Sequence, residues 1–378
     1  MIFRPSENPI IKKQTMHTAV PPAQRPSETR SDGLADTFAD RLIRWQKQHG
    51  RHNLPWHSRD PYRVWLSEIM LQQTQVSTVA RYYPRFLAAF STAAALAAAP
   101  EDQVLALWQG LGYYSRARNL HKAAKQIAAE HGGAFPRSRA GLETLSGVGR
   151  STAAAIAAFA FCQRETILDG NVKRVLCRVF AREGDPADKK FEQSLWTLAE
   201  SLLPADPADM PAYTQGLMDL GATVCTRAKP QCPACPMADV CQARKQGRTA
   251  ELPRRKSTQP VPTLPLYWLV LRDSDGAVFL QKRPTKGIWG GLYCVPCFDT
   301  LEALHDAAAQ HGVCSDGLEE QAALTHRLTH RLLLITPFAA RCGRPSEKVS
   351  DGLWVPPQDL PAYGLPKPLA AYLGAEAV

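Results

Sequence analysis

The chain has 378 residues, 45% of them hydrophobic, and a formal net charge of +10 at pH 7. This length exceeds the size at which one hydrophobic core usually keeps growing, so we expect two domains. The positive charge indicates an anionic partner, either nucleic acid or an anionic membrane surface. The longest apolar runs, such as residues 153–161, are too short for a membrane helix, so no membrane span is expected.

Residues 1–35 contain five prolines among charged residues and lack the apolar core of a secretory signal. We expect a disordered N-terminal extension and a cytoplasmic protein. From residue 36 to residue 243, apolar stretches with helical spacing alternate with short Gly and Pro breaks, and β-branched alternation is scarce. This pattern predicts an all-helical domain.

Residues 244–265 form a basic, proline-rich stretch, which is typical of a stiffened linker. Beyond it, residues 266–272 and 277–282 flank Asp275-Gly276, a strong hairpin signal, and residues 332–338 form another strand candidate. A helical run at residues 301–311 lies between them. Residues 266–370 are therefore predicted to form a mixed α and β domain.

Four of the ten cysteines lie in one short segment at residues 225–241, namely Cys225, Cys232, Cys235 and Cys241. Four thiolates in a compact loop suit either a zinc ion or a 4Fe-4S cluster. Zinc knuckles more often use two short pairs, and only one occurs here. A separate pair, Cys294 and Cys297, lies in an expected strand without a second pair, which favours a structural origin.

The segment Leu145-Ser-Gly-Val-Gly-Arg150 is a glycine-rich turn that opens an alanine-rich helix. Its glycines, Gly147 and Gly149, allow backbone N–H groups to face a phosphate. An ordinary turn between two helices is the alternative interpretation, and the motif alone does not decide between them.

Two acidic residues are candidates for chemistry. Glu68 lies in an otherwise apolar helical stretch, where desolvation would raise its pKa toward that of a general acid. A lone acid there can also be exposed or paired. Asp169 follows an apolar segment and heads a predicted helix, where an N-cap role is the simpler interpretation.

These motifs, in this order, resemble the MutY family of adenine DNA glycosylases, which are helix-hairpin-helix enzymes with an iron-sulfur loop. The resemblance is densest between residues 38 and 241 and continues more faintly to the C-terminus. It rests on Leu54-Pro-Trp56 and on residues 61–62, 64–76, 110–114, 116–122 and 168–174. The resemblance implies a helix-hairpin-helix glycosylase domain with a 4Fe-4S cluster on the four cysteines.

The resemblance also implies roles for residues. Glu68 protonates N7 of a flipped adenine, Asp169 stabilises the oxocarbenium-like sugar or briefly bonds to it, and Asn171 orients the carboxylates. The related endonuclease III family carries a lysine nucleophile where this chain has Ser151. A serine cannot form a Schiff base, so a monofunctional glycosylase, with weak lyase activity at most, is expected.

Contacts to flipped DNA follow from the same resemblance. Gln72 and Gln73 contact the disrupted helix, Tyr113 wedges beside the opposing base, and Trp56 and Gln215 border the adenine pocket. For Trp56 and Tyr113 a place in the hydrophobic core is a competing interpretation. Gly147 and Gly149 grip a backbone phosphate.

The C-terminal part resembles the Nudix-like domain with which this family senses 8-oxoguanine. A glutamate-rich Nudix box is not found after Gly291, so pyrophosphate hydrolysis is not expected. The family's recognition triplet corresponds to Leu328-Thr329-His330, in which the aromatic residue is missing. The expected partner is duplex DNA with adenine opposite 8-oxoguanine or guanine, bound by a monomer.

Two rival functions remain open. A pyrimidine glycosylase with lyase activity is disfavoured by Ser151 and by the context of Glu68. A DNA-binding protein without catalysis, with a zinc loop, is disfavoured by the presence of both acids.

Overall fold

The computed structural model describes residues 36–254, 260–344 and 352–374. From residue 37 onward, the described residues form one compact unit. The expected N-terminal extension, and residues 255–259 of the expected linker, lie outside the described residues. No helix in the described ranges has the length and apolar character needed to cross a membrane.

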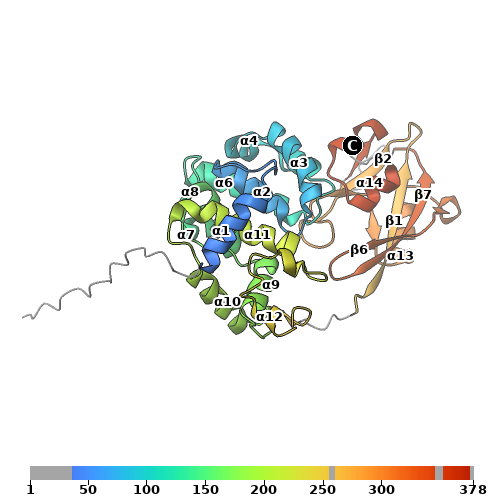
Figure 1. Ribbon diagram of the computed structural model, residues 1–378. Coiled ribbons are helices and arrows are strands. Elements are labelled where there is room, and N and C mark those ends of the chain that lie inside the picture. The colour runs from blue at the N-terminus through green and yellow to red at the C-terminus, as the bar shows by residue number, and fades with distance from the viewer. Residues whose placement is uncertain (1–35, 255–259, 345–351, 375–378) are drawn as a thin grey trace, which may run out of the picture. The chain divides into compact units, whose positions relative to one another are not determined.

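The first part of this unit is built from helices, coloured blue to yellow in Figure 1. Short helical turns η1 (Pro207–Asp209), η2 (Leu220–Val224) and η3 (Cys232–Ala234) connect or follow the later helices. The helices are α1 (Phe38–His49), α2 (Pro61–Leu71), α3 (Val76–Ala89), α4 (Ala93–Ala98), α5 (Glu101–Leu107), α6 (Ser115–Glu130), α7 (Arg139–Glu143), α8 (Arg150–Phe161), α9 (Gly170–Val179), α10 (Lys189–Ser201), α11 (Met210–Asp219) and α12 (Gln242–Lys245).

Helix α2, which carries Glu68, begins where local chemistry favours a start. The Asp60 side chain accepts a hydrogen bond from the Tyr62 N–H, and Pro61 occupies the first turn, where a missing N–H carries no penalty. Most of its side chains are buried, so α2 packs inside the helical part rather than on its surface. Glu68 is therefore held among apolar neighbours.

The glycine-rich turn connects α7 to α8. Gly147 has φ +79, and a Cβ at this position would lie 2.7 Å from the Cβ of Asn119. Only glycine meets both the conformational and the steric demand without strain. Gly149 is the N-cap of α8 and contributes no capping side chain, so no side-chain cap satisfies the first amides of this helix.

The second part contains one mixed sheet of eight strands. Their order is β3-β2-β1-β7-β5, with β4 paired to β1, β6 to β7 and β8 to β2, and only the central β1 and β7 run parallel. The strands are β1 (Thr263–Arg272), β2 (Val278–Lys282), β3 (Tyr293–Cys294), β4 (Cys297–Phe298), β5 (Glu319–Glu320), β6 (Leu324–Arg327), β7 (Leu332–Arg341) and β8 (Leu353–Val355).

Strand β1 begins at Thr263, inside the segment expected to be linker. The expected strand starts after Pro265, because that proline falls in the basic, proline-rich stretch expected to be a linker. In the structure, Pro265 opposes Leu334 of β7, whereas β4 pairs only with Tyr267 and Trp268 on the other side. The missing N–H therefore lies where β1 has one neighbour, and the strand continues through it.

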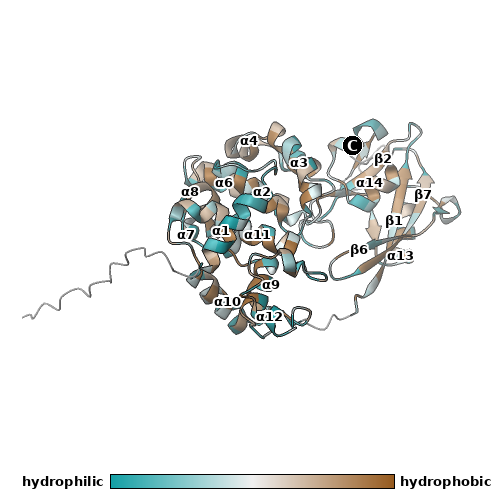
Figure 2. Ribbon diagram, viewed as in Figure 1, coloured by the Kyte–Doolittle hydropathy of each residue, from teal (hydrophilic) through white to brown (hydrophobic). Residues whose placement is uncertain are grey.

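The second part also contains two helices, α13 (Leu301–Gln310) and α14 (Lys367–Leu373), and two short helical turns, η4 (Ser315–Gly317) and η5 (Pro357–Ala362). Apolar residues concentrate on the central strands, as the brown colouring of β1 and β7 shows (Figure 2). The expected succession of an all-helical part and a mixed α and β part is confirmed.

Candidate active site and DNA-contact residues

Glu68 lies beside a small pocket that also contains Trp56 and Gln215. Burial raises the pKa of the Glu68 carboxyl to about 8, and the negative charge of Asp169 contributes to this rise. Glu68 is therefore mostly protonated at neutral pH. The structure thus brings Gln215 together with Trp56 and Glu68, which lie far from it in the sequence.

The pocket has a volume of about 60 Å³, which is room for a few water molecules but not for a purine. Trp56 is 7% exposed and packs edge-on against Tyr83 at 5.9 Å, so it belongs to the hydrophobic core as well as to the pocket wall. Side chains must move before a base can enter.

A buried polar chain fixes one wall of this pocket. The Gln215 Nε2 donates to Asp219 Oδ1 at 2.8 Å, and the Arg51 Nε donates to the same oxygen at 2.7 Å. Asp219 is fully buried, so these donors and the Arg51 N–H at 2.9 Å stabilise its charge. Because a carboxylate only accepts, the nitrogen of the Gln215 amide is directed to Asp219 and its oxygen remains for another donor.

Asp169 is the N-cap of α9, and its Oδ1 accepts from the Val172 N–H at 2.8 Å. The N-cap interpretation therefore holds, yet the same charge also acts on Glu68. Ser151 of α8 contributes to this position, because its hydroxyl accepts from the Leu168 N–H at 3.1 Å. Ser151 thus anchors the residue immediately before Asp169.

Asn171 is held by Arg174, whose Nη2 donates to the Asn171 Oδ1 at 2.8 Å. The same guanidinium donates to the carbonyls of Gly221 and Cys225 at 2.7 and 2.8 Å. Asp169, Asn171 and Arg174 line a cleft of about 620 Å³, together with Arg227, Arg254 and further residues. Its arginines give this cleft the charge that suits a phosphate backbone.

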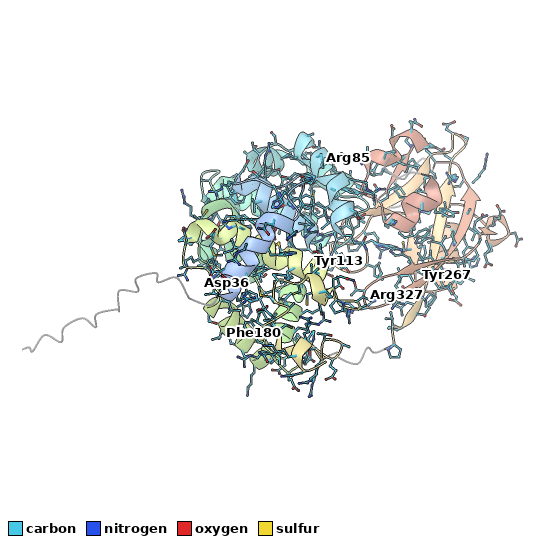
Figure 3. The ribbon with its side chains drawn as sticks, in the orientation of Figure 1. Asp36, Arg85, Tyr113, Phe180, Tyr267 and Arg327 are labelled. Carbon is cyan, nitrogen blue, oxygen red and sulfur yellow. The ribbon has the colours of Figure 1, made fainter. Side chains whose placement is uncertain are left out.

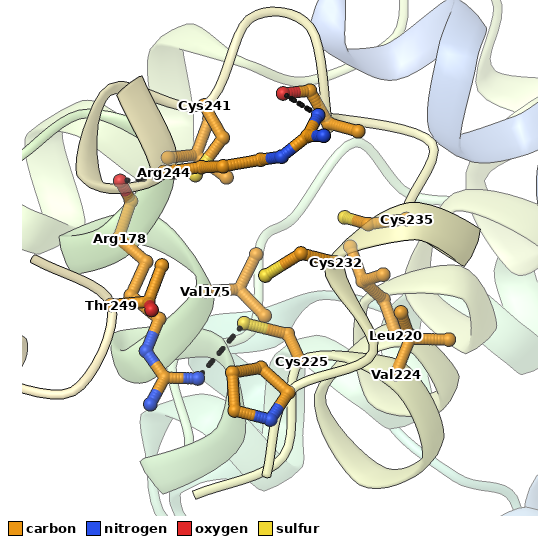
Figure 4. Close-up of a pocket in the computed structure, with 13 residues that line it drawn as sticks. Val175, Arg178, Leu220, Val224, Cys225, Cys232, Cys235, Cys241, Arg244 and Thr249 are labelled. Carbon is orange, nitrogen blue, oxygen red and sulfur yellow. Dashed lines mark hydrogen bonds between the residues drawn. The ribbon is translucent and has the colours of Figure 1, made fainter. Parts of the chain in front are cut away.

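The four cysteines of residues 225–241 line one common pocket (Figure 4). Burial raises the pKa of the Cys235 thiol to about 12, and the neighbouring cysteines contribute to this rise. Four thiols that share one pocket cannot all lose their protons unless cations lie between the sulfur atoms. The four thiols are the donor type that a metal centre bound as thiolates requires, and they must draw closer together to hold one, because no group of three or more His, Cys, Asp or Glu side chains among the described residues is placed to bind a metal ion.

Arg178 supports the same conclusion, because its guanidinium is buried beside this pocket. It donates to Cys225 Sγ at 3.4 Å and to the carbonyls of Thr226 and Leu252 at 2.7 and 2.9 Å. These partners include no carboxylate, and the residue is only 2% exposed. Thiolates in an anionic centre would supply the missing negative charge.

The residues expected at the disrupted DNA helix gather around the end of α2. The Gln72 Nε2 donates to the Thr152 hydroxyl at 3.2 Å and to the Gly147 carbonyl at 3.4 Å, which ties it to the glycine-rich turn. Gln73 has φ 57, an unusual conformation for a residue other than glycine. This conformation directs the chain away from α2 immediately after Gln72.

Tyr113 is 43% exposed, so the core interpretation is wrong for this residue (Figure 3). Its hydroxyl lies 2.8 Å from the Thr329 hydroxyl, and its ring lies 5.6 Å from the guanidinium carbon of Arg116. Arg116 in turn donates to the carbonyls of Ile69 and Met70 at the end of α2. The exposed ring is thus positioned from two sides.

Thr329 and His330 lie in the bend between β6 and β7. They line a cleft of about 570 Å³ that also contains Tyr113, Trp289 and His326. His326 lies near Trp289, with ring centroids 6.0 Å apart. The structure therefore brings together Tyr113 with Thr329 and His330, which are distant in the sequence.

Three contributors were not singled out from the sequence, namely Asp219, Arg174 and Arg178. Arg174 and Arg178 act mainly through partners on other elements, so no local pattern marks them. Asp219 is different, because it is an acid among apolar residues of α11, as Glu68 is in α2. The same sequence pattern could therefore have singled it out.

Two segments match known families. Residues 66–201 match the HhH-GPD superfamily base excision DNA repair protein, and residues 267–375 match the NUDIX domain. Among solved structures, a thermostable thymine-DNA glycosylase is similar, with a TM-score of 0.50 and 28% identity. The match covers 55% of this chain and 95% of that chain.

Several adenine DNA glycosylases align with more than half of this chain. The adenine DNA glycosylase of Buchnera aphidicola subsp. Baizongia pistaciae (strain Bp) is 35% identical over 302 residues, which cover 80% of this chain and 85% of the relative. That of Buchnera aphidicola subsp. Acyrthosiphon pisum (strain APS) is 33% identical, with coverages of 89% and 96%. The Homo sapiens adenine DNA glycosylase is 45% identical, with coverages of 57% and 41%. The chain belongs to the adenine DNA glycosylases and is a base excision repair glycosylase with a helix-hairpin-helix domain and a Nudix-like domain.

Proposed function

We propose that this enzyme flips adenine paired with 8-oxoguanine or guanine out of duplex DNA and hydrolyses its N-glycosidic bond by acid catalysis. The observation that carries this proposal is the pair Glu68 and Asp169. Burial, with the charge of Asp169, raises the pKa of Glu68 to about 8, so one carboxyl is a proton donor at neutral pH.

The chemistry needs that proton because adenine is a poor leaving group. Glu68 donates its proton to N7 of the flipped base, and the C1′–N9 bond breaks with its electron pair moving to the purine. The carboxylate of Asp169 stabilises the positive charge that develops on the sugar. Water then adds to C1′, and the Glu68 carboxylate accepts the proton that this water releases.

Recognition of adenine is proposed to involve Gln215. Asp219 holds the amide nitrogen, so the amide oxygen is the acceptor that the pocket offers. The exocyclic amino group of adenine is a donor, whereas guanine and thymine carry an oxygen at the matching position. Asp219→Asn would relax this orientation, because an asparagine side chain can also donate, and excision of adenine should slow.

Contacts to the DNA are proposed at three places. The amides near Gly147 and Gly149 bind a backbone phosphate, Gln72 and Gln73 contact the opened helix, and Tyr113 wedges beside the opposing base. Thr329 and His330 carry groups that both donate and accept, which suits the changed N7 and C8 edge of 8-oxoguanine. Domain boundaries at residues 36–243 and 263–373, the second shifted from 266–370 to include all of β1 and α14, and a monomeric, cytoplasmic enzyme complete the proposal.

We assign the metal centre as a 4Fe-4S cluster held by Cys225, Cys232, Cys235 and Cys241. Its proposed role is to fix this loop, and with it the carbonyl of Cys225 that binds Arg174. Elemental analysis should give iron and no stoichiometric zinc. The opposite result would replace the cluster with a zinc site.

The direct test is a single-turnover assay on matched duplexes with adenine opposite 8-oxoguanine, guanine or thymine. Treatment with hot alkali should reveal abasic sites, and without alkali the strand should remain largely intact, because Ser151 cannot form a Schiff base. Asp169→Asn should nearly abolish excision and leave DNA binding in place. Strand cleavage without alkali would instead support a bifunctional enzyme.

A further inference from the structure

Cys294 and Cys297 lie close together in the Nudix-like sheet, away from the proposed active site. Their sulfur atoms are 3.5 Å apart, and both are free thiols. Cys294 opposes Gln281 of β2, while Cys297 opposes Trp268 of β1. The sheet thus holds the two sulfurs from two different strands, which sets their separation independently of the short turn between them.

The turn itself is fixed by the backbone. The Pro296 carbonyl accepts from the Leu269 N–H of β1 at 3.0 Å. A disulfide needs sulfur atoms about 2.05 Å apart, so the pair must close by about 1.5 Å. Rotation of the side chains supplies a movement of this size without a change of the strand pairing.

The two thiols have different surroundings. Cys294 is fully buried, and burial raises the pKa of its thiol. Cys297 is partly exposed, and the hydrogen bond from the Cys294 thiol, assisted by the charge of Arg283, lowers its pKa. A partly exposed thiol with a lowered pKa beside a fully buried thiol is the arrangement found in dithiols that react with oxidants, although ionisation of Cys297 would give up the hydrogen bond that its thiol donates to the Val295 carbonyl at 3.1 Å.

A further donor lies at the same place. The indole N–H of Trp268 is buried and has no acceptor in good hydrogen-bond geometry among the described residues, but it approaches Cys297 closely enough to help lower the pKa of that thiol. Trp268 and Cys297 are directly opposed across β1 and β4, so their side chains lie on the same face of the sheet. A thiolate at Cys297 would give this donor an acceptor, which a neutral thiol supplies only weakly.

A metal site and simple packing both fit the pair less well than redox chemistry does. A metal ion bound by protein side chains usually needs more than two ligands, and residues 287–298 offer only these two sulfurs. Simple packing would place two thiols together but would not place a cation and an unpaired N–H beside the more exposed one.

We propose that Cys294 and Cys297 are a reversible dithiol and disulfide pair whose oxidant is a small hydroperoxide, with Cys297 as the attacking thiolate. The Cys297 sulfur attacks the terminal peroxide oxygen, the O–O bond breaks, and the departing alkoxide or hydroxide takes up a proton. Cys297 is then a sulfenic acid. The Cys294 sulfur attacks it, the S–O bond breaks, and water leaves with the Cys294 proton.

The test uses the full-length enzyme with hydrogen peroxide at concentrations that leave its visible absorbance unchanged. After alkylation of free thiols, chymotrypsin cleaves at Tyr293 and Phe298 and releases residues 294–298. Mass spectrometry should find this peptide unalkylated and lighter by two hydrogen atoms, and dithiothreitol should reverse the change. Formation should be roughly tenfold faster than oxidation of Cys314, an exposed thiol of the same domain.

Three variants separate the steps. In Cys294→Ser, Cys297 should accumulate as a sulfenic acid that dimedone traps, whereas in Cys297→Ser the remaining Cys294 should stay reduced. Cys314→Ser is the matched control and should form the 294–298 disulfide as the native chain does. Circular dichroism verifies folding of each variant. Oxidation of Cys294 and Cys297 no faster than that of Cys314, or disulfides that join two chains, would overturn the proposal.

Discussion

Replacing Glu68 by glutamine should have opposite effects on catalysis and on stability. Glutamine keeps the shape of the side chain but cannot donate a proton from oxygen or ionise. General acid catalysis typically contributes about 10²- to 10⁴-fold, so the single-turnover rate of adenine excision should fall by that range. Stability should rise, because the native carboxyl opposes folding at neutral pH.

The size of the stability change follows from the pKa. Burial, with the charge of Asp169, raises the pKa of Glu68 from its ordinary 4.5 to about 8, so the folded state favours the protonated form. The folding penalty is absent below the ordinary pKa, grows as the pH rises and levels off above the raised one. It is about 1 kcal/mol at pH 5 and about 3 kcal/mol at pH 7. Glu68→Gln removes it.

The assay combines single-turnover excision with urea unfolding of both proteins at pH 5 and pH 7. The native enzyme should also lose about tenfold in rate for each pH unit above about 8, as Glu68 loses its proton. A variant that is inactive and also less stable at pH 7 would refute the reasoning, because Glu68 would then be a structural residue held in its ionised form.

The remaining predictions concern three other sites. Ser151→Lys should introduce a Schiff base that borohydride traps on DNA, and it should weaken stability by about 1 kcal/mol through loss of the hydrogen bond from the Leu168 N–H. Cys232→Ser should lower the iron content and the visible absorbance and should destabilise the loop that binds Arg174, measured by metal analysis and thermal unfolding. Thr329→Ala with His330→Ala should reduce the preference for 8-oxoguanine over guanine by about 1 to 3 kcal/mol, measured on matched duplexes at fixed salt.

Local patterns predicted the elements well, because helix caps, glycine turns and strand alternation act over a few residues. The start of α8 after Gly149 and the strands around residues 266–282 are examples. The strand through Pro265 could not be foreseen, since whether a missing N–H matters depends on which neighbour β1 has at that point.

The candidate site is only partly readable from sequence for the same reason. An acid in an apolar helix indicated a raised pKa for Glu68, but the charge of Asp169 and the network through Asp219 act across long stretches of chain. The hydrogen bond between Tyr113 and Thr329 joins residues 216 positions apart. Composition and spacing carry no signal for such a contact, and the three-dimensional fold creates it.

The most direct test of the proposed function is the base released from a duplex with adenine opposite 8-oxoguanine under single-turnover conditions. We predict free adenine, an intact strand that breaks only after hot alkali, and almost no product from Asp169→Asn. Release of a pyrimidine from a damaged pair, strand cleavage without alkali, or full activity in Asp169→Asn would contradict the proposed function.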